Sequence, residues 1–345
     1  MSTEITTVTP SELAAILTLA IRERMPIMIS GKPGVGKSKI VEQAVAAAKA
    51  DLVLKHPVVD DPTDYKGMPW VDKGVASFLP FGDLNLLINA KKPTVAFFDD
   101  LGQASNSVQA ASMQLFLARR INGHKVSDFV TFIAATNRRA DRAGVQGILE
   151  PLKSRFDGLF ELEVDIDDWC TWALNNGLPH EMVAFIRFRP ALLSDFKATA
   201  DMTNSPSPRG WESVARWYKL GMPSRLQVVC YEGAVGKGAA GEWLAFSRVW
   251  QQMVSPDLIL TNPDTAPIPK GEPSALYAVA GALAQRVQPA SMGRYMTYLE
   301  RVFDEGEPEP CAASIKMALA RDPKLANTQG YIKGMSGALG QLMIG

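Results

Sequence analysis

The chain has 345 residues, of which 47% are hydrophobic, so it is long enough for two or three domains with sizeable cores. Lys plus Arg and Asp plus Glu are equal at 36 each, and this balance gives no indication of a nucleic-acid or anionic-membrane partner. No apolar run reaches the length of a membrane span, and no basic N-terminal region precedes an apolar stretch, so we expect neither a membrane span nor a secretory signal.

The first predicted element is an amphipathic helix that begins after Thr9 and ends at about Arg24. Thr9 can cap this helix, Pro10 suits its first turn, and Glu12 stands at the capping-box position. The apolar residues that share one face are Leu13, Ile16, Leu17, Ala20 and Ile21.

A complete G-x-x-x-x-G-K-S phosphate-binding loop follows. It stands between an apolar run at 27–29, which predicts a buried strand, and a helical run at 39–50, and this context argues against a chance glycine-rich turn. Glycines let backbone N–H groups turn toward a phosphate, and the N-terminus of the following helix favours negative charge. We expect Lys37 to reach the β- and γ-phosphates of a nucleotide and the Ser38 hydroxyl to bind Mg²⁺. The residues predicted to bind the nucleotide are Gly31, Lys32, Pro33, Gly34, Val35, Gly36, Lys37, Ser38 and Lys39.

Further strands are predicted by continuous apolar runs at 52–56, 94–98, 129–134 and 159–164. Such runs are typical of parallel strands that are covered on both faces. Helical segments such as 107–120 alternate with them, so residues 1–165 are predicted to form a doubly wound α/β domain with a parallel sheet flanked by helices.

After residue 165, helical segments interrupted by Pro and Gly replace the strand-like runs. We expect a helical domain over 166–255, a linker or exposed loop over 255–273, and a helical C-terminal extension over 256–345. The run at 233–238 resembles a second phosphate loop, but it lacks the Ser or Thr and the spacing, and it is interpreted as a turn between helices.

Polar side chains follow two of the predicted strands. Asp99 and Asp100 come directly after the apolar run at 94–98, and ligands of open α/β sheets gather at the carboxyl ends of strands. Asp99 is therefore predicted to help hold Mg²⁺ and Asp100 to polarise an attacking water; the alternative is a strand-ending turn with two solvated acids. Asn137 ends the next strand, where its amide could bind the γ-phosphate or that water, or could simply be a turn asparagine.

Four segments resemble the AAA+ ATPases, and most closely the MoxR branch. They are the phosphate-binding loop, FFDD at 97–100, AATNR at 134–138 and PLKSRF at 151–156. The marks of that branch are the segment at 70–81, a predicted hairpin at 119–128 and Ser-Pro-Arg-Gly-Trp at 207–211. The resemblance covers about residues 10 to 250, and the segment from about 256 matches nothing in it.

The resemblance implies an AAA+ core followed by a helical lid, and it assigns roles to three polar residues. Asn137 takes the place of sensor one, Arg155 that of an arginine finger reaching the γ-phosphate of a neighbouring subunit, and Arg209 that of sensor two, closing the lid over the nucleotide. Phosphoryl transfer needs positive charge where the γ-phosphate becomes more negative, and guanidinium offers a fixed fork for phosphate oxygens. The alternatives are a surface arginine at 155 and a helix-start arginine at 209.

The chain departs from the family where Asp100 stands in place of the usual Glu. Aspartate is one methylene shorter, and a misplacement of about 1 Å can cost about a hundredfold in rate. The sequence fits either slow hydrolysis or a backbone shift that compensates for the shorter side chain.

For each of two other segments, the sequence allows two interpretations. Arg138, Arg139 and Arg142 either line a subunit interface or form a solvated face. A hairpin flanked by Trp70 and Phe78 either faces the ring centre or a partner, as an insert does in MoxR-like proteins, or packs locally with its tryptophan buried.

The resemblance implies an ATP hydrolase that binds ATP with Mg²⁺ between subunits of a ring, expected to be hexameric, and remodels a protein client. It also implies a von Willebrand A domain partner with a metal-ion-dependent adhesion site, although the client itself is not indicated. Two alternatives are a nucleic-acid motor such as a helicase or packaging ATPase, which the neutral charge makes a poorer fit, and an ATP-gated scaffold with weak hydrolysis. The three cysteines, at 170, 230 and 311, form no C-x-x-C pair and favour free thiols in a cytoplasmic protein.

Overall fold

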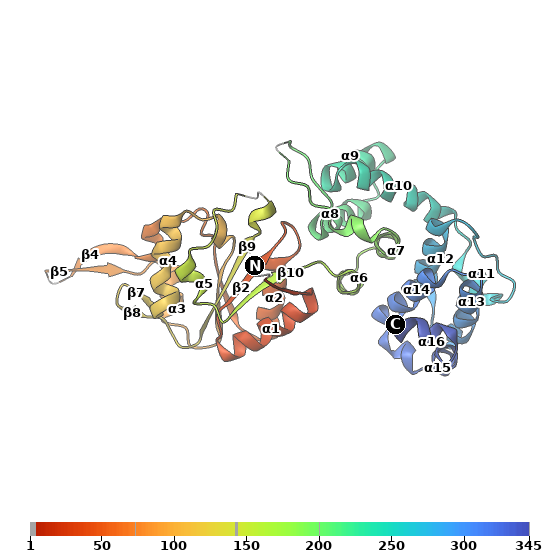
Figure 1. Ribbon diagram of the computed structural model, residues 1–345, viewed down its shortest axis with the longest axis horizontal. Helices are drawn as coiled ribbons and strands as arrows, with labels where there is room; N and C mark the ends of the chain where they lie inside the picture. Colours follow the sequence, from red (N-terminus) through yellow and green to blue (C-terminus); the bar gives the residue numbers. More distant parts are fainter. Residues whose placement is uncertain (1–4, 73, 142–143, 200, 345) are drawn as a thin grey trace. The chain divides into compact units, whose positions relative to one another are not determined.

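A computed structural model describes residues 5–72, 74–141, 144–199 and 201–344 (Figure 1). Within these residues the chain forms two compact units. The first comprises residues up to Val164 together with 196–199, and the second comprises the remainder from Asp165 onward. The expected division at residue 255 between a lid and a C-terminal extension falls inside the second unit and stays a prediction.

A six-stranded sheet forms the centre of the first unit, and all of its neighbouring strands run parallel. In spatial order the strands are β1 (Thr6–Val8), β10 (Gly158–Leu162), β2 (Ile27–Gly31), β9 (Val130–Asn137), β6 (Thr94–Phe98) and β3 (Asp51–Lys55). This confirms the α/β class and the strands predicted from continuous apolar runs. The edge strand β1 was not predicted, because three residues are too few to show a pattern.

Both faces of the sheet are buried, since alternate residues of a strand point to opposite faces. In β6, Val95 and Phe97 join one apolar cluster, whereas Ala96 and Phe98 join the other. The first cluster includes side chains of α1 (Pro10–Glu23) and α2 (Lys37–Ala47). The second includes side chains of α3 (Gly82–Ile88), α4 (Asn106–Ala118) and α5 (Glu150–Lys153). The predicted capping box at Thr9 is confirmed, because Thr9 and Glu12 exchange hydrogen bonds at 2.8 and 3.3 Å.

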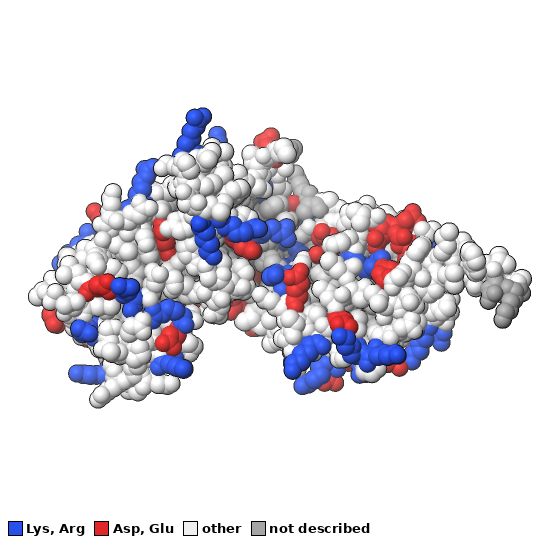
Figure 2. Space-filling view, turned by 180° about the vertical axis from the view of Figure 1, so that it is seen from behind, with Lys and Arg blue, Asp and Glu red and all other residues white. Residues whose placement is uncertain are grey.

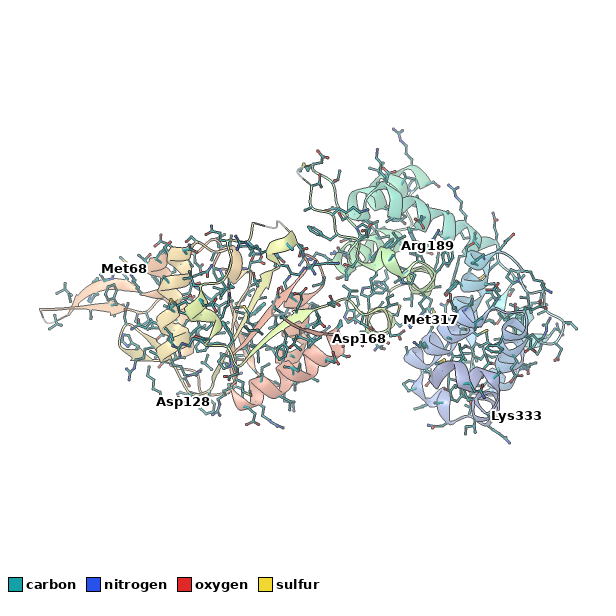
Figure 3. The ribbon with its side chains drawn as sticks, in the orientation of Figure 1. Met68, Asp128, Asp168, Arg189, Met317 and Lys333 are labelled. Atoms are coloured by element: carbon teal, nitrogen blue, oxygen red, sulfur yellow. The ribbon has the colours of Figure 1, made fainter. Side chains whose placement is uncertain are left out.

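Two hairpins extend from the loops of this unit. Strands β4 (Met68–Asp72) and β5 (Val75–Leu79) form the longer one, which projects from the unit in Figure 1 and carries Met68, labelled in Figure 3. Trp70 is 57% exposed and Phe78 is 39% exposed, so the interpretation with a buried tryptophan is wrong. Strands β7 (Arg120–Ile121) and β8 (His124–Lys125) form the shorter hairpin before β9, as expected.

The second unit is built from helices around an aromatic core in which Phe185 contacts Trp211, Trp243 and Phe246 at ring-centroid distances of 5.4 to 5.5 Å. Its helices are α6 (Ile166–Asn175), α7 (His180–Phe188), α8 (Pro208–Lys219), α9 (Ser224–Val235), α10 (Lys237–Gln252), α11 (Pro256–Thr261), α12 (Pro273–Arg286), α13 (Met292–Asp304), α14 (Pro308–Arg321), α15 (Gln329–Met335) and α16 (Ala338–Ile344). Of the helices that the structure describes, none is both long and apolar enough to cross a membrane.

Two features of the second unit test the interpretation of its loops. The glycine-rich run at 233–238 contains a turn between helices at Gly236, as predicted, because α9 ends at Val235 and α10 begins at Lys237. The segment at 255–273 is not entirely a loop, because it contains α11. Pro256 occupies the first turn of that helix, and Ile259 and Leu260 are buried, so packing stabilises a helix that the Pro- and Asp-rich composition concealed.

Glu181 on α7 is a buried acid in the second unit. It is 3% exposed, and its Oε2 accepts a hydrogen bond from the Tyr218 hydroxyl at 2.5 Å. Burial raises the pKa of Glu181 above the ordinary value near 4.5, although hydrogen bonding opposes the shift.

We expect Glu181→Gln to become more stable relative to the parent as pH rises above 4.5. In that window the unfolded chain loses the Glu181 proton while the folded chain retains it, so the free energy of unfolding of the parent falls until the pH passes the raised folded-state pKa. Urea unfolding at several pH values from 4 to 7 measures this, with the exposed Glu300→Gln as control. A difference that is constant over this range would contradict the assignment.

Candidate functional site

The polar residues predicted from the sequence meet at the carboxyl ends of three adjacent strands. Strand β9 lies between β2 and β6, and its pairing with β2 places Asn137 opposite Gly31. The loop at 32–36 follows β2, and Asp99 follows β6. Open α/β sheets bind ligands at this edge, where the connections of neighbouring strands diverge.

The glycines of the loop shape its turn into α2. Gly34 has a φ of 78° and Gly36 a φ of 103°, both in the left-handed region that side chains with a Cβ rarely adopt. Gly36 precedes α2 and has no side chain with which to cap it. The first-turn N–H groups of a helix have no intrahelical partners, and together with the helix dipole they favour an anion here.

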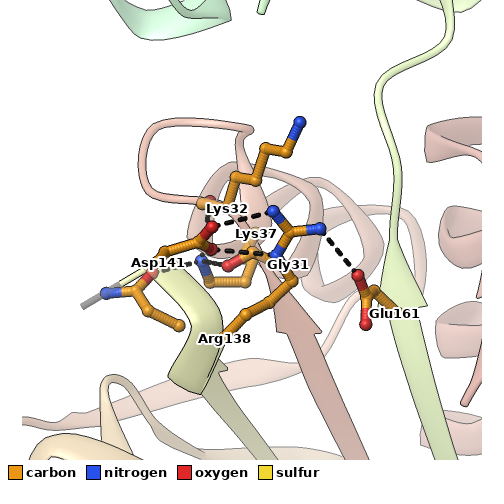
Figure 4. Close-up of polar contacts among 7 residues, drawn as sticks. Gly31, Lys32, Lys37, Arg138, Asp141 and Glu161 are labelled. Atoms are coloured by element: carbon orange, nitrogen blue, oxygen red, sulfur yellow. Dashed lines mark hydrogen bonds and ion pairs between the residues drawn. The ribbon is translucent and has the colours of Figure 1, made fainter. Parts of the chain in front are cut away.

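Lys37 is the first residue of α2, and it is 7% exposed. Its Nζ donates hydrogen bonds to the carbonyl oxygens of Gly31 at 2.9 Å and Lys32 at 3.1 Å, and to Oδ1 of Asn137 at 2.7 Å (Figure 4). A buried ammonium is stable only with such partners, and these contacts hold it beside the loop. Lys39, also predicted to bind nucleotide, is exposed and pairs with Glu42 at 3.1 Å.

Ser38 and Asp99 form an oxygen pair next to the loop. The Ser38 hydroxyl donates to Oδ2 of Asp99 at 2.7 Å, and the Asp99 N–H donates to the Lys55 carbonyl at 3.0 Å, which fixes the end of β6 to β3. Mg²⁺ prefers oxygen ligands and usually takes few from the protein, with waters and substrate phosphates completing its shell. One carboxylate beside one hydroxyl fits that requirement.

Asp100 begins a turn with left-handed backbone, at φ 60° and ψ 32°. Its Oδ1 accepts hydrogen bonds from Nε2 of Gln103 at 2.6 Å and from Nδ2 of Asn137 at 3.4 Å. Asn137 therefore connects Asp100 with Lys37. Gln103 was missed by the sequence reasoning, and the available signal was a polar side chain three residues beyond the paired acids.

The two predicted arginines both occupy exposed positions, one in each unit. Arg155 is exposed just beyond α5 in the first unit. Arg209 is exposed in the first turn of α8 in the second unit, where Ser207 caps the helix by accepting from the Gly210 N–H at 3.1 Å. Their roles stay predictions.

Arg138 does not belong to a solvated basic face. It donates to Asp141 at 2.8 and 2.9 Å and to Glu161 on β10 at 3.0 Å (Figure 4). Its hydrogen bonds with Asp141, opposed by partial burial, hold the pKa of Arg138 above its usual value. Arg139 is exposed, and Arg142 lies outside the described residues. Arg138 thus serves the fold by joining the end of β9 to β10.

One family model matches most of the first unit. Residues 27–164 match the family model described as ATPase family associated with various cellular activities (AAA). Curated proteins give no match in sequence. Among solved structures the chain is similar to RuvB, a Holliday junction branch migration motor of Thermotoga maritima, at 14% identity and a TM-score of 0.36 over 85% of this chain and 86% of that chain. A point mutant of the same protein gives 13% identity and a TM-score of 0.37 over the same shares.

We expect Arg138→Ala to lower the free energy of unfolding by about 1–3 kcal/mol, because it leaves the carboxylates of Asp141 and Glu161 without their partner, and Asp141 is only 8% exposed. The neighbouring Arg139→Ala is the control, with an expected change within about 0.5 kcal/mol for an exposed side chain. Urea unfolding of both variants measures the difference, and equal effects would contradict the ion-pair assignment.

Proposed function

We propose that the chain is a Mg²⁺-dependent ATP hydrolase of the AAA+ superfamily, similar to the MoxR branch, that works as a ring-forming remodelling motor. The match of residues 27–164 to the AAA family model supports this proposal. The observation that carries the proposal is the hydrogen-bonded group of Lys37, Asn137 and Asp100, with Ser38 and Asp99 beside it, at the ends of three adjacent strands.

ATP would bind with its β- and γ-phosphates at the loop and at the first turn of α2. Phosphate oxygens would replace the carbonyls of Gly31 and Lys32 as partners of the Lys37 ammonium, since an anion is the better acceptor for a buried cation. Ser38 and Asp99 would hold Mg²⁺, which when bound neutralises charge on the β- and γ-phosphate oxygens.

Hydrolysis needs a base and a positioned water. We assign the base to Asp100: a water oxygen bonds to the γ-phosphorus, its proton passes to the Asp100 carboxylate, and the bond from the γ-phosphorus to the β,γ-bridging oxygen breaks. The products are ADP and inorganic phosphate, and the proton leaves Asp100 for phosphate or solvent. Asn137 would orient the water. Arg155 of a neighbouring subunit and Arg209 of the helical unit would stabilise the charge that builds on the γ-phosphate.

Assembly and partner follow from the same proposal. An exposed Arg155 can reach the site of another subunit, which supports a ring, and the hexamer is inferred from the family alone.

The hairpin of β4 and β5 exposes Trp70 and Val71, an apolar surface that fits a protein better than a polyphosphate backbone. On the face shown in Figure 2, Lys and Arg lie among Asp and Glu. We therefore favour a protein client in the cytoplasm, with a von Willebrand A domain partner as in MoxR-like proteins.

Asp100→Asn should lower the single-turnover rate of ATP hydrolysis by about a hundredfold or more, because the amide cannot accept the water proton. ATP binding should persist in this variant, whereas Lys37→Ala should abolish binding, because the phosphates lose their buried cation. Rapid-quench hydrolysis and equilibrium binding of ATP measure the two effects. An unchanged rate in Asp100→Asn would exclude Asp100 as the base, and negligible turnover of the assembled parent would favour the ATP-gated scaffold.

If Arg155 acts as an arginine finger in the site of a neighbouring subunit, two inactive variants should complement each other. Arg155→Ala and Asp100→Asn should each be inactive, but mixed rings should recover up to about a quarter of the parent rate, because an intact base then meets an intact finger at a fraction of interfaces. Steady-state ATPase assays of remixed subunits measure the recovery. Lys153→Ala, on the same segment, is the control and should retain the parent rate. A fully active Arg155→Ala or a mixture without recovery would rule out the shared site.

A further inference from the structure

Gln103 contacts the acid at the centre of the proposed site. It ends the short 3₁₀ helix Leu101–Gln103, which begins directly after Asp100. Its Nε2 donates to Oδ1 of Asp100 at 2.6 Å. The hydroxyl of the buried Thr136, which precedes Asn137 on β9, lies 3.0 Å from the Asn137 carbonyl and 3.4 Å from Oε1 of Gln103, and its single proton can be donated to either oxygen.

The hydrogen bonds to Asp100 are unequally distributed between its two oxygens. Gln103 and Asn137 both donate to Oδ1, whereas Oδ2 has no protein partner among the residues that the structure describes. Two donors on one oxygen restrict rotation of the carboxylate about its terminal bond. The other oxygen is thereby left to accept a hydrogen bond from water.

The turn that carries Gln103 is closely packed against β9. A Cβ on Gly102 would lie 2.1 Å from the Thr136 Oγ1, so only glycine allows the turn to approach this closely. The Gly102 carbonyl also accepts from the N–H of Gln146 at 3.0 Å. The support beneath Gln103 is therefore fixed by packing on one side and by a backbone hydrogen bond on the other.

We propose that Gln103 is a positioning residue for hydrolysis: its amide holds Oδ1 of Asp100 so that Oδ2 faces the attacking water. The inference rests on the proposed ATPase function and adds a residue that the family resemblance did not assign. In this role Gln103 acts through Asp100 and does not itself bind the nucleotide. Its loss should therefore lower kcat and leave KM for ATP unchanged.

The test compares Gln103→Leu, which keeps the length of the side chain but removes the amide, with the smaller Gln103→Ala. Both should lower kcat by about ten- to a hundredfold, as expected when a reacting group loses its alignment, with KM and ATP binding within about twofold of the parent. The control is Gln114→Leu, an exposed position on α4, which should retain the parent kcat. Thermal unfolding of each variant shows whether the fold is intact.

A double-mutant cycle separates positioning from a general structural effect. If Gln103 acts through Asp100, then Gln103→Leu should leave the residual rate of Asp100→Asn unchanged within about twofold. An equal fractional loss in both backgrounds, or a parent-like kcat in Gln103→Leu, would overturn the inference alone. A parent-like rate in Asp100→Asn would overturn the proposed base, and the inference with it.

Discussion

The parallel pairing of β2 with β9 is the constraint on which the site depends. Its register sets Gly31, the first residue of the phosphate loop, opposite Asn137, and a shift of one residue would move Asn137 to the other face of the sheet. The bond from Lys37 to Asn137 crosses this strand pair, and the bond from Asn137 to Asp100 crosses the next one toward β6. Buried apolar side chains on both faces hold the register, so the core of the first unit and the geometry of its polar edge have one physical origin.

Two positively charged side chains lie at this edge of the sheet, Arg138 and Lys37, and they have different hydrogen-bond partners. Arg138 follows Asn137 directly, but Asp141 and Glu161 already bind its guanidinium. The Lys37 ammonium donates to carbonyl and amide oxygens, which an anion can replace as acceptors. In the proposed mechanism, further positive charge at the γ-phosphate must come from Arg155 and Arg209. Because the proposal takes Arg155 from a neighbouring subunit and Arg209 from the helical unit, hydrolysis would depend on subunit assembly and on the helical unit.

The sequence predicted local structure well and long-range pairing poorly. Continuous apolar runs located the longer strands, because this signal lies within a few adjacent residues. The partners of Arg138 were not predictable, since Glu161 stands on β10 and reaches Arg138 only through the order of strands in the sheet. The short helix α11 was missed for a related reason: its stability comes from the burial of Ile259 and Leu260, which composition does not show.

Aspartate in place of glutamate at position 100 has a local rationale in the turn. A left-handed φ is uncommon for residues other than glycine, and aspartate is among the side chains that tolerate it best. The aspartate side chain also places its Oδ1 within 2.6 Å of the Gln103 amide nitrogen. Asp100 is thus associated with the left-handed backbone of its turn, the close packing at Gly102 and the amide of Gln103. A lone Asp100→Glu change would lengthen the acid without changing the turn that aims it.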